Sequence, residues 1–473
     1  MDRRRQALGA VTLGSFMTYL DNNVANVALP TIQRELGLTI SGLEWIVSAY
    51  ILVFAGLMLA GGRLADVLGA RRVFLAGLLV FTVSSLAAGL AMDGTALVAA
   101  RAVQGVGAAL LTPTALALIT QLFPDPAERG RAVGIWGATG ALSMALGPVT
   151  GGFISEHLHW GWIYLINVPL GAVAMGLALW AVRPAPVRAR HSLDLPGLVT
   201  SATALSALTY ALIEGGAAGW TSPGILAAFG IALLAAVAFV LAETRAAEPM
   251  IDLSLFRSRT FTGGLVTSGI WSFGVFGIYF FSALWLQNVL AFSPVEAGAA
   301  FVPMAVLMAV VAVLSQRVTR LLGLAVTVAA GMALMGIAIL MLAGVGADGG
   351  YGDVLPWFLS YGLGAGLLVP LTAAMLSGMP AGRSGVASGV LNVSREVFGL
   401  LGITVLGALL TSRQAGSGLA PLPAFLDAYQ FTLVVAAVIV LAGIPVGLYA
   451  LRRPRTPGRP APQAAGTAVG SAN

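Results

Sequence analysis

The chain has 473 residues, of which 58% are hydrophobic and only 9% are charged. An ordinary soluble domain contains roughly 25% charged residues, and a water-facing surface cannot be built from so few charges, so this composition predicts a protein that crosses a membrane many times. The absence of Cys excludes disulfides and thiolate metal sites, and the absence of Lys excludes a Walker A phosphate-binding loop.

Fourteen apolar stretches follow one another along the chain, each long enough for a helix that crosses about 30 Å of hydrocarbon. The strands of a membrane barrel are shorter and alternate in polarity, so the predicted fold class is an all-α polytopic membrane protein. We expect the first stretch to be a span, since no small-residue cleavage site follows it. The predicted spans are 7–29, 44–62, 73–92, 95–122, 132–153, 162–182, 196–214, 223–242, 262–290, 297–315, 322–346, 353–376, 386–410 and 428–450.

The basic residues predict the orientation. All 25 are Arg, and 21 of them fall at the two termini and in alternate loops, whereas the opposite loops hold only Arg34 and Arg413. By the positive-inside rule both termini are cytoplasmic. The absence of Lys is typical of a GC-rich bacterial genome, so we expect the bacterial cytoplasmic membrane. The Arg residues are then expected to contact the lipid bilayer and not nucleic acid. The Pro-rich segment 453–473 is expected to be a disordered tail.

Two distant segments have nearly the same sequence, GVGAALLTP at 105–113 and GLGAGLLVP at 362–370. Other glycines repeat at similar offsets, with Gly69 matching Gly323 and Gly147 matching Gly399. The agreement predicts a duplicated six-helix unit, as in secondary transporters that bind substrate near the midplane between two halves. The predicted domains are an N-terminal half 1–182, a linker 183–250 with two extra helices, a C-terminal half 251–452 and the tail 453–473.

The first motif is LDNNVANVALP at 20–30. Asp21 lies about three residues from the centre of its predicted span, which is within ~5 Å of the midplane. An ionised carboxylate at that depth costs about 2.5–3.5 kcal/mol, so we expect Asp21 to face a cavity and to exchange protons. The alternative is a structural Asp that caps a helix kink.

The second motif is GGRLADVLGARR at 61–72, in a loop on the predicted cytoplasmic side. Its glycines permit close packing and a tight turn. Its acidic residue can form charge-assisted hydrogen bonds with one of the two following Arg residues and so latch one conformation. In the second copy Arg320 replaces the acid, so only the first half keeps the latch. The predicted latch consists of Gly62, Asp66, Gly69, Arg71 and Arg72.

The third motif, LVAARAVQGVGAALLTP at 97–113, places Arg101 inside an apolar span. Such a charge is expensive and indicates function, and Gln104 shares its helix face by i,i+3 spacing. In the second copy Phe358 and Tyr361 take these places, so the glycine scaffold was kept twice and the charge once.

The fourth motif is GALSMALGPVTGG at 140–152. Glycines at this spacing let another helix approach closely, and a Pro inside the helix removes a backbone donor and bends it. The residues that form this motif are Gly147, Pro148, Gly151 and Gly152.

These four motifs resemble those of the major facilitator superfamily, in particular its 14-helix drug:proton antiporters (the DHA2 type), over essentially the whole chain. The resemblance implies the major facilitator fold, with two six-helix halves and two linker helices. It also implies proton-coupled export of lipophilic drugs or antibiotics by a monomer that uses the proton gradient and no cofactor. In this family the fourth motif is associated with antiport. Asn23 departs from the usual Thr of the first motif.

Two alternatives within transport remain open: export of one specific endogenous metabolite, or import by the same fold. A membrane enzyme would need a catalytic constellation, and the sequence shows no His-rich cluster, carboxylate-metal motif or phosphate loop. The loop residues His157 and His159 lack a carboxylate cluster and predict no metal site. The chain is therefore not expected to be an enzyme.

In the second half, Arg395 and Glu396 lie near the middle of span 386–410. Adjacent helix positions point about 100° apart, so the two need not pair. Glu396 can attract cationic substrates or carry a second proton; the alternative is a structural ion pair. The aromatic residues of span 262–290 can line a cavity for flat apolar compounds, although packing or lipid contact is open for each.

The site predictions combine both halves. The predicted proton-coupling residues are Asp21, Arg101 and Glu396. The predicted substrate-binding residues are Asp21, Asn26, Tyr50, Gln104, Trp271, Phe273, Phe276, Tyr279, Tyr361, Asn392 and Glu396. The expected ligand is a small lipophilic compound, either neutral or cationic.

Overall fold

The computed structural model describes residues 3–183, 194–246, 249–251, 253–377 and 384–452, and these residues form helices and connecting segments without a strand. Within these residues, thirteen helical segments are long and apolar enough to cross a membrane. Helix α1 (Arg3–Leu36) packs among them as a fourteenth, and its apolar run is interrupted by Asp21 and three Asn residues. The predicted all-α fold class is confirmed.

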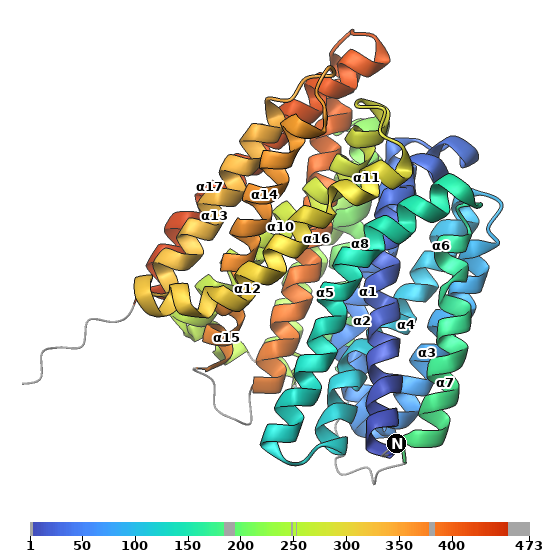
Figure 1. Cartoon of the computed structure of the whole chain (residues 1–473), viewed down its shortest axis with the longest axis vertical. Coiled ribbons are helices and arrows are strands. Elements are labelled where there is room, and N and C mark those ends of the chain that lie inside the picture. Colours follow the sequence, from blue (N-terminus) through green and yellow to red (C-terminus); the bar gives the residue numbers. More distant parts are fainter. Residues whose placement is uncertain (1–2, 184–193, 247–248, 252, 378–383, 453–473) are drawn as a thin grey trace, which may run out of the picture.

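The N-terminal half packs its helices side by side in alternating direction (Figure 1). Helices α6 and α7 form one continuous span, because Ile166 between them keeps helical dihedral angles. Asp125 caps α5 by accepting hydrogen bonds from two backbone N–H groups, and Pro126 follows it, which is a favoured helix start. The remaining helices are α2 (Ile40–Leu68), α3 (Ala70–Gly89), α4 (Gly94–Leu122), α5 (Pro126–His157), α6 (Trp162–Leu165) and α7 (Asn167–Ala181).

The described residues of the C-terminal half form six spans, as those of the N-terminal half do. Phe301 joins α11 to α12, and Leu368 joins α14 to α15, each with helical dihedral angles, so each pair crosses as one unit. The elements are a short 3-10 helix (Leu253–Arg257), α10 (Arg259–Asn288), α11 (Pro294–Ala300), α12 (Val302–Leu322), α13 (Leu324–Ala343), α14 (Tyr351–Leu367), α15 (Val369–Ser377), α16 (Ser384–Gly416) and α17 (Pro421–Leu451).

Two linker helices, α8 (Leu195–Ala218) and α9 (Pro223–Arg245), pack against each other. The indole N–H of Trp45 on α2 donates to Glu214 on α8 at 2.8 Å. Just beyond α8, Trp220 donates to the Ser412 hydroxyl of α16 at 3.0 Å. Helix α8 therefore covers the seam between the two halves on one side, and α9 packs on α8.

The repeated segments make matching contacts in both halves. A Cβ atom added to Gly105 would lie 2.6 Å from the Tyr50 carbonyl oxygen, and one added to Gly362 would lie 2.5 Å from the Met304 carbonyl oxygen. Tyr50 and Met304 are themselves 254 residues apart, which is also the separation of Gly69 and Gly323. The duplicated glycines thus bring the same pair of helices into backbone contact twice.

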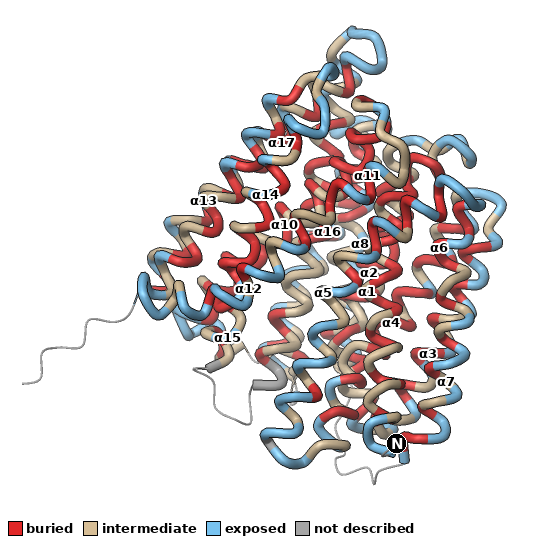
Figure 2. Tube along the Cα trace, viewed as in Figure 1, coloured by how far each residue is buried: buried red, intermediate tan, exposed pale blue. Residues whose placement is uncertain are grey.

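The halves meet at one end of the bundle and diverge toward the end where α1 begins (Figure 1). We call the latter the arginine-rich end, because Arg3, Arg71 and Arg72 lie there. At the opposite end, Gln287 donates to the Val27 carbonyl oxygen at 2.8 Å. Buried residues line the interior faces of the helices, while exposed ones face outward as in a membrane protein (Figure 2).

Candidate substrate cavity and charged cluster

Four polar side chains from α1, α4 and α7 form an enclosed cluster, which we call the charged cluster: Asp21, Arg101, Gln104 and Asn167, each at most 2% exposed. Arg101 donates to one carboxylate oxygen of Asp21. Gln104 and Asn167 each donate to the other oxygen at 2.8 Å. The Nε of Arg101 also donates to the Ile46 carbonyl oxygen at 3.2 Å. The Asp21 charge is thus balanced by a cation and held by three donors.

Two aromatic rings enclose the guanidinium of Arg101. It lies 4.3 Å from the Tyr50 ring centroid and 5.5 Å from that of Tyr164, within reach of cation–π attraction. We expected Asp21 to face a cavity, but it lies in the enclosed charged cluster instead. The physical reason is that Arg101 supplies the counter-charge, so the carboxylate does not depend on water at this depth.

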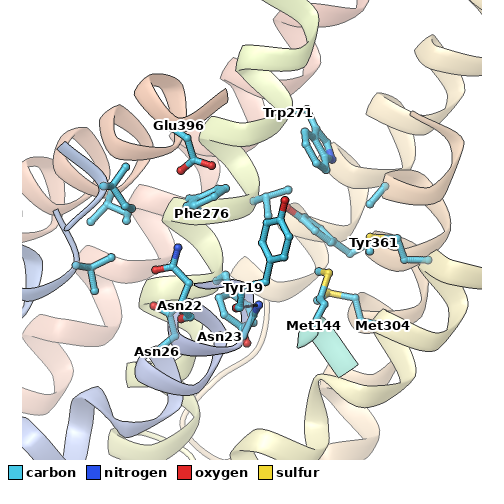
Figure 3. Close-up of a pocket in the computed structure, with 17 residues that line it drawn as sticks. Tyr19, Asn22, Asn23, Asn26, Met144, Trp271, Phe276, Met304, Tyr361 and Glu396 are labelled. Atoms are coloured by element: carbon cyan, nitrogen blue, oxygen red, sulfur yellow. Dashed lines mark hydrogen bonds between the residues drawn. The ribbon is translucent and has the colours of Figure 1, made fainter. Parts of the chain in front are cut away.

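A cavity of about 310 Å³ lies between the two halves (Figure 3). Its wall comes from α1, α2 and α5 of the first half and from α10, α12, α14 and α16 of the second. This volume falls at the lower end of the range of small-molecule sites. Six predicted residues line it: Asn26, Trp271, Phe276, Tyr279, Tyr361 and Glu396.

Other predicted substrate-binding residues lie outside this lining: Asp21, Tyr50, Gln104, Phe273 and Asn392. Phe273 instead packs its backbone against Gly402. The cavity adds residues that were not predicted, among them Tyr19, Asn22, Asn23, Met144, Met304 and Met308. Helical periodicity could have found those on α1, because positions 19, 22, 23 and 26 share one face, whereas position 21 points away from it.

Several polar atoms at the cavity have no hydrogen-bond partner. They are Asn26 Oδ1, Trp271 Nε1, Tyr279 Oη, Tyr361 Oη and Glu396 Oε2. Buried polar atoms are normally paired, and a mostly apolar pocket with a few convergent polar groups is the usual form of a ligand site. The cavity thus offers both donors and acceptors to a bound molecule.

Arg395 and Glu396 have different surroundings. Arg395 donates to the hydroxyls of Ser268 at 2.8 Å and Thr372 at 2.6 Å. Glu396 lies on the cavity wall, and one of its oxygens is unpaired. No ion pair between these two neighbours is found in the described part of the chain.

The predicted latch is not closed in this structure. Gly69 has φ +89° and Gly323 has φ +82°, so both copies make the same tight turn. Asp66 is exposed and forms no ion pair with the Arg residues that follow it. Arg71 donates instead to the Leu179 carbonyl oxygen at 3.2 Å, because the last carbonyl groups of α7 lack intrahelical partners and attract cations. The backbone N–H of Arg72 donates to the Gly69 carbonyl oxygen at 3.1 Å, and Gly62 lies beside Pro113 of α4.

The fourth motif packs α5 against both halves. Gly147 and Gly151 contact α1 at Asn23 and Val24, where an added Cβ would overlap the neighbouring helix. Across the interface, Gly152 abuts the Pro294 carbonyl, and the Pro148 carbonyl oxygen faces Gly298 in the same way. These small residues therefore form the contact between the halves at the end opposite the arginine-rich end.

A duplicated bundle with a cavity between its halves is the architecture of a secondary transporter. The family model of the Major Facilitator Superfamily matches residues 11–403, and the chain belongs to this family. It is a membrane transporter and not an enzyme.

The chain is 36% identical over 404 residues to the methylenomycin A resistance protein of Streptomyces coelicolor, covering 85% of each chain. It is 35% identical over 404 residues to the multidrug resistance protein Stp of Mycobacterium tuberculosis, covering 85% of this chain and 75% of the relative. The tetracenomycin C resistance and export protein of Streptomyces glaucescens is 36% identical over 406 residues, with the same coverages.

Among solved structures, the fold is similar to that of a bacterial homologue of the human lysosomal transporter Spinster, in an inward-facing and unoccupied conformation. The TM-score is 0.68 and the identity 16%, with 95% of this chain and 97% of that chain covered. At this identity the likeness shows the fold alone.

Proposed function

We propose that the chain is a proton-coupled antiporter that exports lipophilic drugs or antibiotics across the bacterial cytoplasmic membrane. It acts as a monomer with both termini in the cytoplasm and draws energy from the proton gradient without a cofactor. The observation that carries the proposal is the cavity between the halves, with its unpaired polar atoms, next to a separate enclosed carboxylate. The names of the resistance and export proteins to which the chain is similar support it.

Helix α1 connects the two sites. One of its faces carries Asn22 and Asn26 to the cavity, and the other carries Asp21 to the charged cluster. A proton on Asp21 neutralises the carboxylate and weakens its bond to Arg101, which biases the position of α1. Substrate on the cavity face of the same helix biases it too, so proton and substrate become linked through differential affinity for two conformations.

Alternating access follows from the contacts between the halves. In this structure they are joined at the end opposite the arginine-rich end, through Gly152 and Gly298. In the opposite conformation these contacts separate, and Asp66 reaches the Arg residues of its motif to close the latch at the arginine-rich end. The latch is thus an element of the second conformation in this proposal.

The test uses inverted membrane vesicles with an acidified lumen and a pH-sensitive dye. Addition of methylenomycin A or tetracenomycin C should release lumenal protons when the wild-type chain is present. Asp21→Asn should abolish this release, because the amide cannot carry the proton. The matched control is Asp427→Asn, the same chemical change at a side chain that is 42% exposed and pairs with Arg413.

Proton release by the well-folded Asp21→Asn protein would remove Asp21 from the coupling mechanism. Compound movement that follows another ion gradient, with no response to pH, would overturn proton coupling itself. If none of these compounds releases lumenal protons but a single cell metabolite does, the result favours a metabolite exporter.

A further inference from the structure

A second chamber of about 280 Å³ lies next to the main cavity. Trp271 and Ala365 belong to both walls, so the two spaces are neighbours. The chamber also contains Ser268 and Thr372, which lie toward the arginine-rich end of α10 and α15 from the shared residues. It therefore lies between the main cavity and the end of the bundle at which the halves diverge.

Arg395 is the charged residue of this wall, and Ser268 and Thr372 are its hydroxyl residues. Its recorded hydrogen bonds go to these two neutral hydroxyls, at 2.8 Å and 2.6 Å. Its guanidinium lies 5.3 Å from the centroid of the Trp271 ring. The rest of the wall is apolar.

The contrast with Arg101 makes Arg395 informative. Both are cations at membrane depth, where a charge is expensive and normally paired. Arg101 has its carboxylate in Asp21. No described carboxylate forms an ion pair with Arg395, and the neighbouring Glu396 lines the main cavity. Hydroxyl groups satisfy hydrogen bonds but do not neutralise a charge. Glu396 attracts Arg395 electrostatically without forming an ion pair, and the wall of the second chamber itself contains no acidic residue.

We propose that the second chamber is a binding subsite for the acidic group of an aromatic organic acid. A carboxylate or sulfonate binds the guanidinium of Arg395, and the attached ring stacks on Trp271 and extends past Ala365 toward the main cavity. Arg is suited to such planar, charge-assisted recognition. The inference rests on the proposed function for the direction of transport, and it adds acidic compounds to the expected substrates.

The same chemistry would also suit the phosphate of an anionic lipid. We favour the organic acid, because the Trp271 ring offers a stacking surface and the chamber adjoins the drug-sized cavity. The experiment has an arm that separates the two sources.

The test measures probe binding to the full chain in phosphatidylcholine nanodiscs, without any gradient, so that it does not depend on proton coupling. The probes are 1-anilinonaphthalene-8-sulfonate and N-phenyl-1-naphthylamine, which share one aromatic frame and differ in the sulfonate. Arg395→Gln should weaken sulfonate binding about ten- to hundredfold, the size of a charge-assisted hydrogen bond, and change amine binding less than about twofold.

Two further variants keep the result interpretable. Arg395→Lys retains the charge without the planar guanidinium and should recover part of the sulfonate binding, which a merely structural role of the side chain would not require. Glu396→Gln removes a neighbouring negative charge and should strengthen sulfonate binding. The two changes at adjacent positions thus act in opposite directions if charge is the cause.

Unchanged sulfonate affinity in Arg395→Gln would overturn the subsite, and so would an equal loss of both probes in folded protein. In discs that contain phosphatidylglycerol, unchanged sulfonate affinity of the wild type supports the organic acid. Competition by that lipid would instead assign Arg395 to lipid phosphate and overturn the substrate reading. Export that fails while the binding pattern holds would count against the proposed function alone.

Discussion

The two halves of the transporter share a scaffold and differ in chemistry. In the first half, Arg101 and Gln104 precede the glycine segment and close a fully enclosed network around Asp21. In the second half, Phe358 and Tyr361 stand at the same positions. The Phe358 ring packs edge-on against the Phe301 ring, with 5.1 Å between the ring centroids. The Tyr361 hydroxyl lies at the cavity without a hydrogen-bond partner.

This difference separates two tasks. The first half keeps a charge pair away from the cavity, where substrate cannot reach it directly. The second half presents most of the aromatic rings of the cavity and four of its five unpaired polar atoms, where a ligand can use them; Asn26 of α1 supplies the fifth. Duplication preserved the glycine contacts that position the helices and left the facing side chains free to diverge. The comparison can be tested by changing equivalent positions in both halves.

The largest effect is expected at the charged position. Arg101→Met leaves the Asp21 carboxylate buried without its cation, which should cost about 3–5 kcal/mol of stability. Phe358→Leu at the equivalent position removes only apolar contacts and should cost less than about 2 kcal/mol. Melting temperatures of the purified proteins in one detergent compare the two.

The double variant Asp21→Asn with Arg101→Met sharpens this test. Removing both charges should recover most of the loss, because the penalty comes from one unpaired charge. If the double variant is no more stable than Arg101→Met, the loss comes from packing, and the distinction between the halves is weaker than we infer.

The sequence predicts this chemistry unevenly. Asp21, Arg101 and Gln104 stand out because charge and amide groups are rare in apolar spans, and two of them share a helix face. Asn167 joins them from α7 without any such signal, since a single Asn near a span end has many uses. Its role depends on how α7 packs against α1, which is a tertiary contact that local patterns do not encode.

The aromatic wall shows the same limit. Trp271 and Tyr279 line the cavity, whereas Phe273 does not. The aromatic composition of the span led us to predict all of them, but side chains two positions apart on a helix point about 200° away from each other. The second chamber was not predicted at all, because Arg395 meets Thr372 only through the packing of α15 against α10 and α16.

An intermediate and equal effect is expected at the shared scaffold. Gly105→Ala places a Cβ 2.6 Å from the Tyr50 carbonyl oxygen, and Gly362→Ala places one 2.5 Å from the Met304 carbonyl oxygen. Both should force the helices apart at a cost of about 1–3 kcal/mol. Gly56→Ala in α2 has no neighbour within 4 Å and serves as the control, which should be neutral or stabilising. Thermal melts in which only one of the paired variants suffers would contradict the structural equivalence.

The smallest effect on stability is expected at Tyr361, and it separates a recognition group from a structural one. Its hydroxyl has no partner in the protein, so Tyr361→Phe removes a buried polar group at no loss of hydrogen bonding. Stability should change by less than about 0.5 kcal/mol or rise. The equivalent change in the first half, Gln104→Leu, removes the bonds to Asp21 and Ser85 and should destabilise the protein clearly.

In transport, Tyr361→Phe should have a clear effect although its effect on stability is small. If its hydroxyl serves substrates, Tyr361→Phe should reduce export of compounds that carry a hydrogen-bonding group about two- to tenfold and leave purely apolar compounds unchanged. The measurement is a resistance profile of a pump-deficient host, normalised to the amount of folded protein. A marked drop in melting temperature together with a uniform drop in export would mean that the hydroxyl is structural. The second half would then have one unpaired group fewer for substrate recognition.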